Sequence, residues 1–274
     1  MGIVNADLTA IATRLRRRIL ETSHRAGIPH LGSCLSCVDL LVYLYWRVLD
    51  IDPDRPDDPD RDRFVLSKGH GAPALFQVLG ERGFFPVERL DEFGANGSVF
   101  HEHPPAPSYL AGVEAATGSL GHGLPMALGM ALGARVSGRS LESYALISDG
   151  ECNEGSIWEA AMLAASLSVE TLCAVVDMNG WQATGRSREV MHLEPLRAKW
   201  EAFGWHVIEI DGHDFDQMDA AFTQVASIRD RPSVVIAHTV KGRGVSFMED
   251  DNNWHYRTPN EDELRRALVD LDVD

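Results

Sequence analysis

Apolar positions along the chain alternate between two spacings, and this alternation predicts an α/β fold. Short continuous apolar runs, typical of buried parallel strands, occur in FVLS, YALIS, LCAVVDMN, WHVIEIDG and SVVIAHTV. Between them, apolar residues recur at helical spacing, which predicts helices over 6–26, 156–166, 192–203 and 214–228. Since strands and helices alternate almost to the end, we expect a doubly wound, mainly parallel sheet with helices on both faces. The 274 residues are expected to form a single domain, 1–274, although this length also suits two small ones.

The segment from Tyr144 to Gly185 places polar oxygen atoms at the ends of two predicted strands. Asp149 directly follows YALIS, Gly150 then permits a sharp turn, and Asn179 ends the next strand. Two parallel strands joined by a helix bring their carboxyl ends together at one edge of the sheet. A carboxylate and an amide suit Mg²⁺ better than Zn²⁺, and Mg²⁺ usually keeps phosphate among its ligands. The pattern predicts a diphosphate held through Mg²⁺, with an ordinary strand–helix–strand unit as the alternative.

Composition and charge argue against several classes of partner. The formal net charge is −16, so we expect no nucleic acid as a partner, and an anionic substrate would need local cations. The first predicted helix is amphipathic, unlike a signal peptide, and no apolar stretch of about 18 residues predicts a membrane span. These observations favour a cytoplasmic protein. Cys34 and Cys37 form a CxxC pair without the second pair that a zinc site needs, so free thiols are expected.

Histidines and glycines mark further candidate positions. His30 is expected in a loop formed with Gly27, Pro29 and Gly32, where a functional role and a capping or exposed position are equally good interpretations. His70 lies between two glycines after FVLS, which suggests the close approach of a ligand. A cluster of glycines precedes another helix, and backbone N–H groups at a helix start suit a diphosphate: Gly118, Gly121 and Gly123. Many loops before helices share this last pattern, so alone it is weak evidence.

Taken together, the motifs resemble the transketolase family. SDG followed by Asn179 resembles the thiamine diphosphate motif, and ECNEGSIWEAA resembles transketolases more than other thiamine enzymes. The segments GIPHLGSCLS, VLSKGH, HEHP, TGSLGHG and TVKGRGVSFMEDDNNWHY are similar to the family's other motifs and follow the family's order. The resemblance runs from the first helix to about Leu264 and implies the thiamine diphosphate-binding fold.

The resemblance also implies roles for individual residues. Mg²⁺ would be bound by the side chains of Asp149 and Asn179 and by the carbonyl of Trp181. The cofactor would be bound by His70, Gly118, Ser119, Leu120, Gly150, Glu151, Asn179, Lys241 and His255. The substrate would face His30, His103 and His255, since imidazoles suit proton transfer near neutral pH.

Some positions depart from the family pattern. Ser148 stands where Gly is usual, which is a mild change, and Cys34 stands where Ser is usual. Glu102 replaces the Gly of the GHP motif, and the segment that follows is longer than usual, so the outer shape of the pocket is expected to differ. Tyr256 replaces a Gly, and its phenol either narrows substrate choice or packs on the surface. His101 has no counterpart in the family and is expected to be exposed.

The resemblance further implies a partner. A transketolase polypeptide also carries a pyrimidine-binding domain, which supplies a glutamate for cofactor activation, and a third domain. Neither is found here, so we expect the N-terminal subunit of a split transketolase, with a separately encoded C-terminal subunit and a dimer of heterodimers as the assembly. The reaction implied is transfer of a two-carbon ketol unit from a ketose or ketose phosphate to an aldose.

Three alternatives remain open on the sequence. One is half of a thiamine enzyme that acts on 2-oxo acids, as a dehydrogenase or decarboxylase. Another is a specialised ketol transferase with an unusual donor. A third is a non-catalytic scaffolding subunit, against which the presence of Asp149 and Asn179 argues, since a decayed site is expected to lose them.

Overall fold

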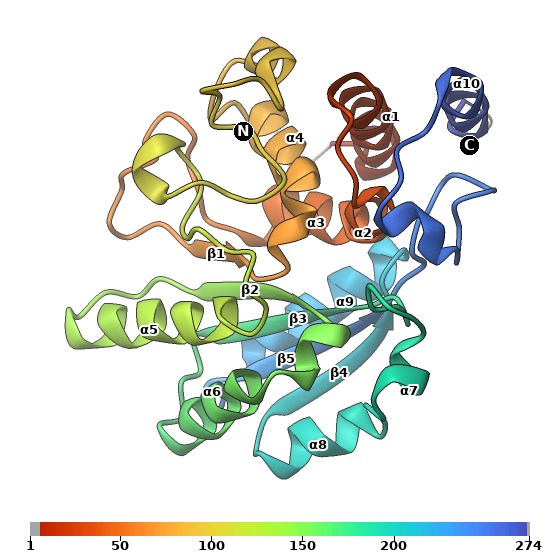
Figure 1. Ribbon diagram of the computed structural model, residues 1–274. Helices are drawn as coiled ribbons and strands as arrows, with labels where there is room; N and C mark the ends of the chain where they lie inside the picture. Colours follow the sequence, from red (N-terminus) through yellow and green to blue (C-terminus); the bar gives the residue numbers. More distant parts are fainter. Residues whose placement is uncertain (1–5, 273–274) are drawn as a thin grey trace.

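A five-stranded parallel sheet forms the centre of the molecule. The computed structural model describes residues 6–272. The strands are β1 (Arg63–Leu66), β2 (Ser143–Ser148), β3 (Leu172–Met178), β4 (His206–Asp211) and β5 (Ser233–His238), in the order β1-β2-β3-β5-β4. This arrangement confirms the doubly wound α/β fold (Figure 1).

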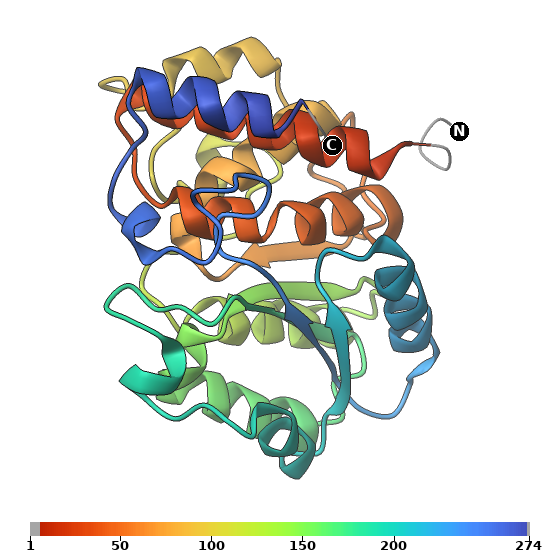
Figure 2. The same ribbon diagram turned by 90° about the vertical axis from the view of Figure 1, so that its right-hand side faces the viewer.

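Helices cover both faces of the sheet. One face carries α5 (Gly123–Val136), α6 (Gly155–Ser166) and α8 (Leu196–Ala202). The other carries α1 (Leu8–Ala26), α2 (Leu31–Ser36), α3 (Val38–Tyr43), α4 (Ala72–Arg82) and α9 (Phe215–Ser227). α10 (Glu261–Asp270) lies against α1, so the first and last helices are side by side (Figure 2). The short α7 (Ser187–Val190) lies beyond the carboxyl edge of the sheet.

Short turns of tighter or wider helix connect these elements. A π-helical turn, η1 (Leu44–Val48), extends α3. The 3₁₀ turns are η2 (Gly69–Gly71), η3 (Val87–Glu92), η4 (Pro107–Tyr109), η5 (Gly150–Asn153) and η6 (Asn252–His255). Two of these, η2 and η5, follow shortly after strand ends, where the predicted ligand-binding motifs lie.

The apolar runs of the strands are explained by burial on two sides. Every residue of β2 is buried, and successive residues point into different cores. Tyr144 and Leu146 belong to the core under α1–α4 and α9, whereas Ala145 and Ile147 belong to the core under α5, α6 and α8. Because both faces are covered there, β2 carries no polar alternation, as the sequence pattern predicted.

Most boundaries differ from the predicted ones by only a few residues, with two larger differences. The helix predicted over 192–203 is shorter, since α8 spans Leu196–Ala202. Gly32 lies inside α2 rather than in the loop that contains Gly27 and Pro29. Among residues 6–272, no helix is both long enough and apolar enough to cross a membrane.

Candidate active site

The carboxyl ends of β2 and β3 bring Asp149 and Asn179 to one edge of the sheet. The two strands are parallel neighbours, with Ser148 paired to Asp177, so the residues that follow them emerge together. The Asp149 side chain is fully buried and accepts hydrogen bonds from the N–H groups of Gly150 (2.9 Å) and Gly180 (3.0 Å). The Ser187 hydroxyl donates a third, at 2.7 Å. Asp149 therefore connects the end of β2 to the loop that follows β3.

This carboxylate has the surroundings of a cation ligand. Burial raises the pKa of Asp149 to about 6. The hydrogen bond from Ser187 opposes this rise, whereas the negative charge of Asp177 adds to it. None of the ion pairs within residues 6–272 includes Asp149. A buried anion without a cationic partner is costly, so a metal ion at this position would relieve the cost. The chemistry of the donor groups therefore fits a bound cation.

Two further oxygen atoms that could bind a metal belong to Asn179 and Trp181, the residues on either side of the Gly180 that Asp149 binds. The Asn179 side-chain oxygen accepts from the Trp181 N–H at 3.1 Å, which leaves an oxygen lone pair for a second partner. Trp181 and Arg186 form an isolated antiparallel bridge, whose bonds run from Ser187 N to Gly180 O and from Gln182 N to Gly185 O. Neither of these two bonds uses the Trp181 carbonyl. One carboxylate, one amide and one carbonyl match the ligand preference of Mg²⁺. The part of the chain that the structure describes has no cluster of three His, Cys, Asp or Glu suited to a metal.

The glycine-rich loop before α5 is held in place by Glu151. The Glu151 carboxylate is fully buried and accepts from the Gly121 N–H at 2.7 Å and from the Ser67 hydroxyl. Ser67 in turn accepts from the Gly123 N–H at 3.0 Å. Burial raises the pKa of Glu151, and these donors oppose the rise. The side chain thus faces the loop and holds its backbone in position.

Gly118 is required by close packing. A Cβ atom built there would lie 2.7 Å from Cδ2 of His103, so only glycine allows the loop and His103 to approach each other in this way. Its φ of 155° is also one that other residues rarely adopt. Ser119 next to it is exposed and Leu120 is half-buried. The loop therefore packs against His103 at Gly118, and Ser119 and Leu120 follow directly in the chain.

Four histidines gather from four separate segments. The centre of the His30 ring lies 5.5 Å from the ring centre of His70, 6.4 Å from that of His103 and 4.9 Å from that of His255. The rings of His70 and His255 are 5.6 Å apart. The His30 N–H donates to the His255 carbonyl at 2.9 Å, so these two segments are also joined through the backbone. The predicted substrate-facing histidines and the predicted diphosphate-facing His70 thus form one cluster.

Burial favours the neutral form of three imidazoles of this cluster, those of His30, His70 and His255. Burial and then Lys241 lower the pKa of His255 to about 3. Burial is also the main cause that places the pKa of His70 well below its ordinary value. The pKa of His30 is lowered by burial as well, although the charge of Glu102 opposes the change. Neutral imidazoles can accept protons or hydrogen bonds from a ligand.

Lys241 supplies an amine next to the cluster. Its Nζ donates to Asn252 Oδ1 at 2.6 Å and lies 3.2 Å from Nδ1 of His255. Burial, followed by the charge of Lys68, lowers the pKa of Lys241 to about 8. The stem of Lys241 crosses α2 at Gly32, where an added Cβ would lie 2.9 Å from its Cγ. An anion bound at this amine would raise its pKa again and keep it charged.

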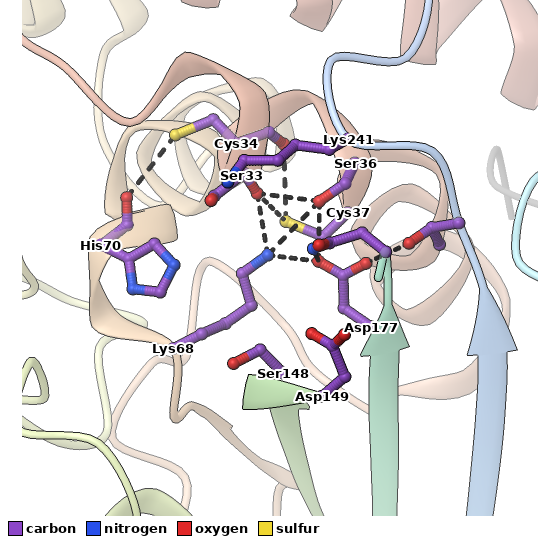
Figure 3. A network of polar contacts seen from close by, with 12 residues as sticks. Ser33, Cys34, Ser36, Cys37, Lys68, His70, Ser148, Asp149, Asp177 and Lys241 are labelled. Carbon is purple, nitrogen blue, oxygen red and sulfur yellow. Dashed lines mark hydrogen bonds and ion pairs between the residues drawn. The ribbon is translucent and has the colours of Figure 1, made fainter. Parts of the chain in front are cut away.

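A buried ion pair beneath the site was missed by the sequence analysis (Figure 3). Lys68 and Asp177 are both fully buried and paired with each other. Lys68 also donates to the Ser33 carbonyl at 2.8 Å, and Asp177 accepts from Ser36 Oγ at 2.7 Å and from the Thr239 hydroxyl. The sequence did carry a signal, since Lys68 stands within VLSKGH and Asp177 is an acid inside an apolar strand.

Comparison with known proteins shows which family the chain belongs to. The family model described as transketolase, thiamine diphosphate binding domain, matches residues 9–274. The chain belongs to the transketolase family. It is 40% identical over 266 residues to a 6-deoxy-6-sulfo-D-fructose transketolase subunit of Clostridium sp., covering 97% of this chain and 96% of that protein. It is 39% identical to an apulose-4-phosphate transketolase subunit of Phocaeicola vulgatus, covering 93% of this chain and 90% of that one.

Solved transketolases share the fold but are longer. The transketolase from Campylobacter jejuni superposes with a TM-score of 0.90 at 26% identity, covering 98% of this chain and 43% of that chain. The transketolase from Leishmania mexicana gives 0.89 at 26% identity, covering 97% and 41%. The chain thus spans about two fifths of these transketolases, whereas it matches the two subunits nearly end to end.

Proposed function

We propose that residues 1–274 form one domain, which is the cofactor-binding subunit of a two-subunit transketolase. The observation that carries this proposal is the buried carboxylate of Asp149, without an ion-pair partner among the described residues, together with the Asn179 amide and the Trp181 carbonyl, whose residues flank the Gly180 N–H that Asp149 binds. These three groups would hold Mg²⁺, and the ion would hold the diphosphate of thiamine diphosphate. When bound, this cofactor supplies the carbanion chemistry that breaks and forms the C–C bonds of ketol transfer.

The chain's own residues would bind and orient the diphosphate. His70 and Lys241 both lie beside His255 and offer an imidazole and an amine. The backbone of Gly118 to Leu120 and of Gly150 to Glu151 would line the remaining sides, with Glu151 holding the glycine loop from behind. Asn179 would contact both metal and diphosphate, and His255 both diphosphate and substrate.

Proton transfer to and from sugar hydroxyls is assigned to His30, His103 and His255. The three rings converge from separate loops, and burial keeps His30 and His255 neutral, in the form that accepts a proton. A positioned imidazole of this kind contributes about 10²–10⁴-fold to a rate.

The proposed partner is a separately encoded subunit with the pyrimidine-binding domain. Apolar side chains that face solvent along α5 and α6 support this part of the proposal, since all are more than one-third exposed: Met126, Met162, Leu163 and Leu167. Glu154 and Glu159, at the start of α6, are exposed too. Such a surface suits burial against a second chain, and a dimer of heterodimers would follow from two-fold symmetry.

We further propose a sugar or sugar phosphate as substrate and the cytoplasm as location, with neither nucleic acid nor membrane as partner. The two subunit relatives are named for 6-deoxy-6-sulfo-D-fructose and for apulose-4-phosphate, a sulfo-sugar and a sugar phosphate.

A comparison of donor substrates distinguishes ketol transfer from the alternative function, turnover of a 2-oxo acid. The chain is mixed with its partner, thiamine diphosphate and Mg²⁺, and offered ketose phosphates, free ketoses or pyruvate together with an aldose. Transfer from a ketose supports the proposal, and turnover of pyruvate alone contradicts it.

A further inference from the structure

Glu102 is an acidic residue at the edge of the histidine cluster. Its Oε2 lies 3.8 Å from Nε2 of His30, which is ion-pair distance but longer than a hydrogen bond. The Glu102 side chain is 46% exposed, whereas that of His30 is 13% exposed. The carboxylate therefore stands at the solvent side of the cluster and faces one particular nitrogen of a largely buried imidazole.

The backbone fixes His30 in front of this carboxylate. His30 has a φ of 72°, an uncommon left-handed conformation for a residue other than glycine, directly before α2. Its N–H donates to the His255 carbonyl at 2.9 Å, and its carbonyl accepts from the Cys34 N–H at 3.0 Å. Functional sites typically contain residues that the surrounding structure, here two backbone hydrogen bonds, holds in a rare conformation.

The other ring nitrogen of His30 is left without a partner among residues 6–272. This atom, Nδ1, is buried and makes no hydrogen bond with any described residue. An unsatisfied buried polar atom in a folded protein calls for a ligand or an ordered water. The two nitrogens thus differ, since Nε2 faces a negative charge whereas Nδ1 has no hydrogen-bond partner among residues 6–272.

We propose that Glu102 is a positioning residue for His30, which keeps the imidazole proton on Nε2 and leaves Nδ1 as the proton acceptor. A carboxylate favours the tautomer whose N–H dipole points toward it. That Nδ1 acts on the substrate rests on the proposed function. In the proton transfer from substrate to His30, the substrate O–H bond breaks, its electron pair stays on oxygen, and the proton forms an N–H bond at Nδ1. The imidazolium so formed faces the negative charge of Glu102.

Several other groups face His30, and they act on it in different directions. The rings of four residues surround it: His70, His103, His255 and Tyr256. Burial is the largest cause that lowers the pKa of His30; His103 and Lys241 lower it too, whereas Glu102 and the backbone bond to His255 raise it. Among these charged neighbours Glu102 is the acid, so removing its charge has a predictable sign: the pKa of His30 falls.

The test is ¹⁵N NMR of the full chain labelled at histidine, with the His30 signals assigned by their loss in His30→Asn. Glu102→Gln removes the charge and keeps the size. The matched control is Glu92→Gln, which removes the same charge from an exposed residue of the preceding segment. At pH 7.5 we expect the Nε2–H form of His30 in the wild type and in the control, and a shift toward Nδ1–H in Glu102→Gln. We also expect the midpoint of the His30 titration to fall in that variant, because the charge of Glu102 raises the pKa of His30.

The tautomer decides the outcome even if His30 remains neutral over the accessible pH range. A wild type that holds its proton on Nδ1, or an equal tautomer ratio in the wild type and Glu102→Gln, overturns the proposal. The NMR result is independent of catalysis. A tautomer shift without ketol transfer in the reconstituted enzyme would count against the proposed function and leave the role of Glu102 standing.

Discussion

Asp149 shows how a single buried side chain can link metal binding to pH. Three hydrogen-bond donors surround its carboxylate, yet burial still raises its pKa to about 6. A protonated carboxyl is a poor metal ligand, and metal binding therefore competes with a proton. The sign follows directly: the proposed Mg²⁺ binding is expected to be strongest above pH 6 and to weaken as the pH falls through that value.

We predict that Mg²⁺-dependent binding of thiamine diphosphate loses up to about tenfold in affinity for each pH unit below about 6. Asp149→Asn should weaken this binding at every pH and remove its pH dependence in that range. Titration calorimetry of the chain mixed with its partner measures both. An affinity in Asp149→Asn equal to that of the wild type at pH 7.5 would show that the carboxylate is not a ligand.

The histidine cluster allows a second test with an internal control. His30→Ala and His255→Ala should each lower turnover by roughly 10²–10⁴-fold, because each removes a positioned proton carrier. His101→Ala should leave turnover unchanged, since His101 is exposed and outside the cluster. Circular dichroism monitors folding in all three. Near-wild-type turnover in both cluster variants would remove these residues from the mechanism.

At the level of elements, the Lys68–Asp177 pair joins segments that are distant in sequence. Asp177 comes from β3, Thr239 follows β5, Ser33 and Ser36 belong to α2, and Lys68 follows β1. Burial alone would lower the pKa of Lys68, but the charge of Asp177 outweighs it and raises that pKa. The same pairing holds the pKa of Asp177 below its ordinary value despite burial. Both groups are therefore charged at neutral pH.

Breaking this pair should be costly because one buried charge is left behind. We predict that Lys68→Met destabilises the chain by about 3–5 kcal/mol, as for other buried pairs that lose one partner. The double variant Lys68→Met/Asp177→Asn, which leaves no charge, should recover a large part of that loss. Urea unfolding measures both variants and Asp177→Asn alone. Additive losses in the double variant would mean that the two charges do not interact.

The same elements show what the sequence could and could not predict. The strand ends at Asp149 and Asn179 followed from apolar runs that stop at polar residues, because parallel strands share one carboxyl edge. The glycine loop was found from its local motif. The contacts of Glu151 with Gly121 and of Lys68 with Asp177 could not be predicted, because they join segments that become neighbours only through tertiary packing. The position of Glu102 next to His30 arises in the same way.

At the scale of the whole molecule, the chain carries both a polar cluster and exposed apolar side chains. The cluster lies at the carboxyl edge of the sheet, and the exposed apolar side chains belong to α5, to α6 and to the residue that follows α6. The chain matches two named transketolase subunits nearly end to end and about two fifths of the longer transketolases. A second chain that completes the cofactor pocket accounts for both observations.

Reconstitution tests this account most directly. A fixed amount of the chain is titrated with the separately produced partner in the presence of thiamine diphosphate and Mg²⁺, and ketol transfer is measured at each ratio. We expect no transfer from either chain alone and a rise that saturates near an equimolar ratio. Full transfer by the 274-residue chain without a partner, or none at any ratio with an intact partner and a ketose donor, would contradict the account.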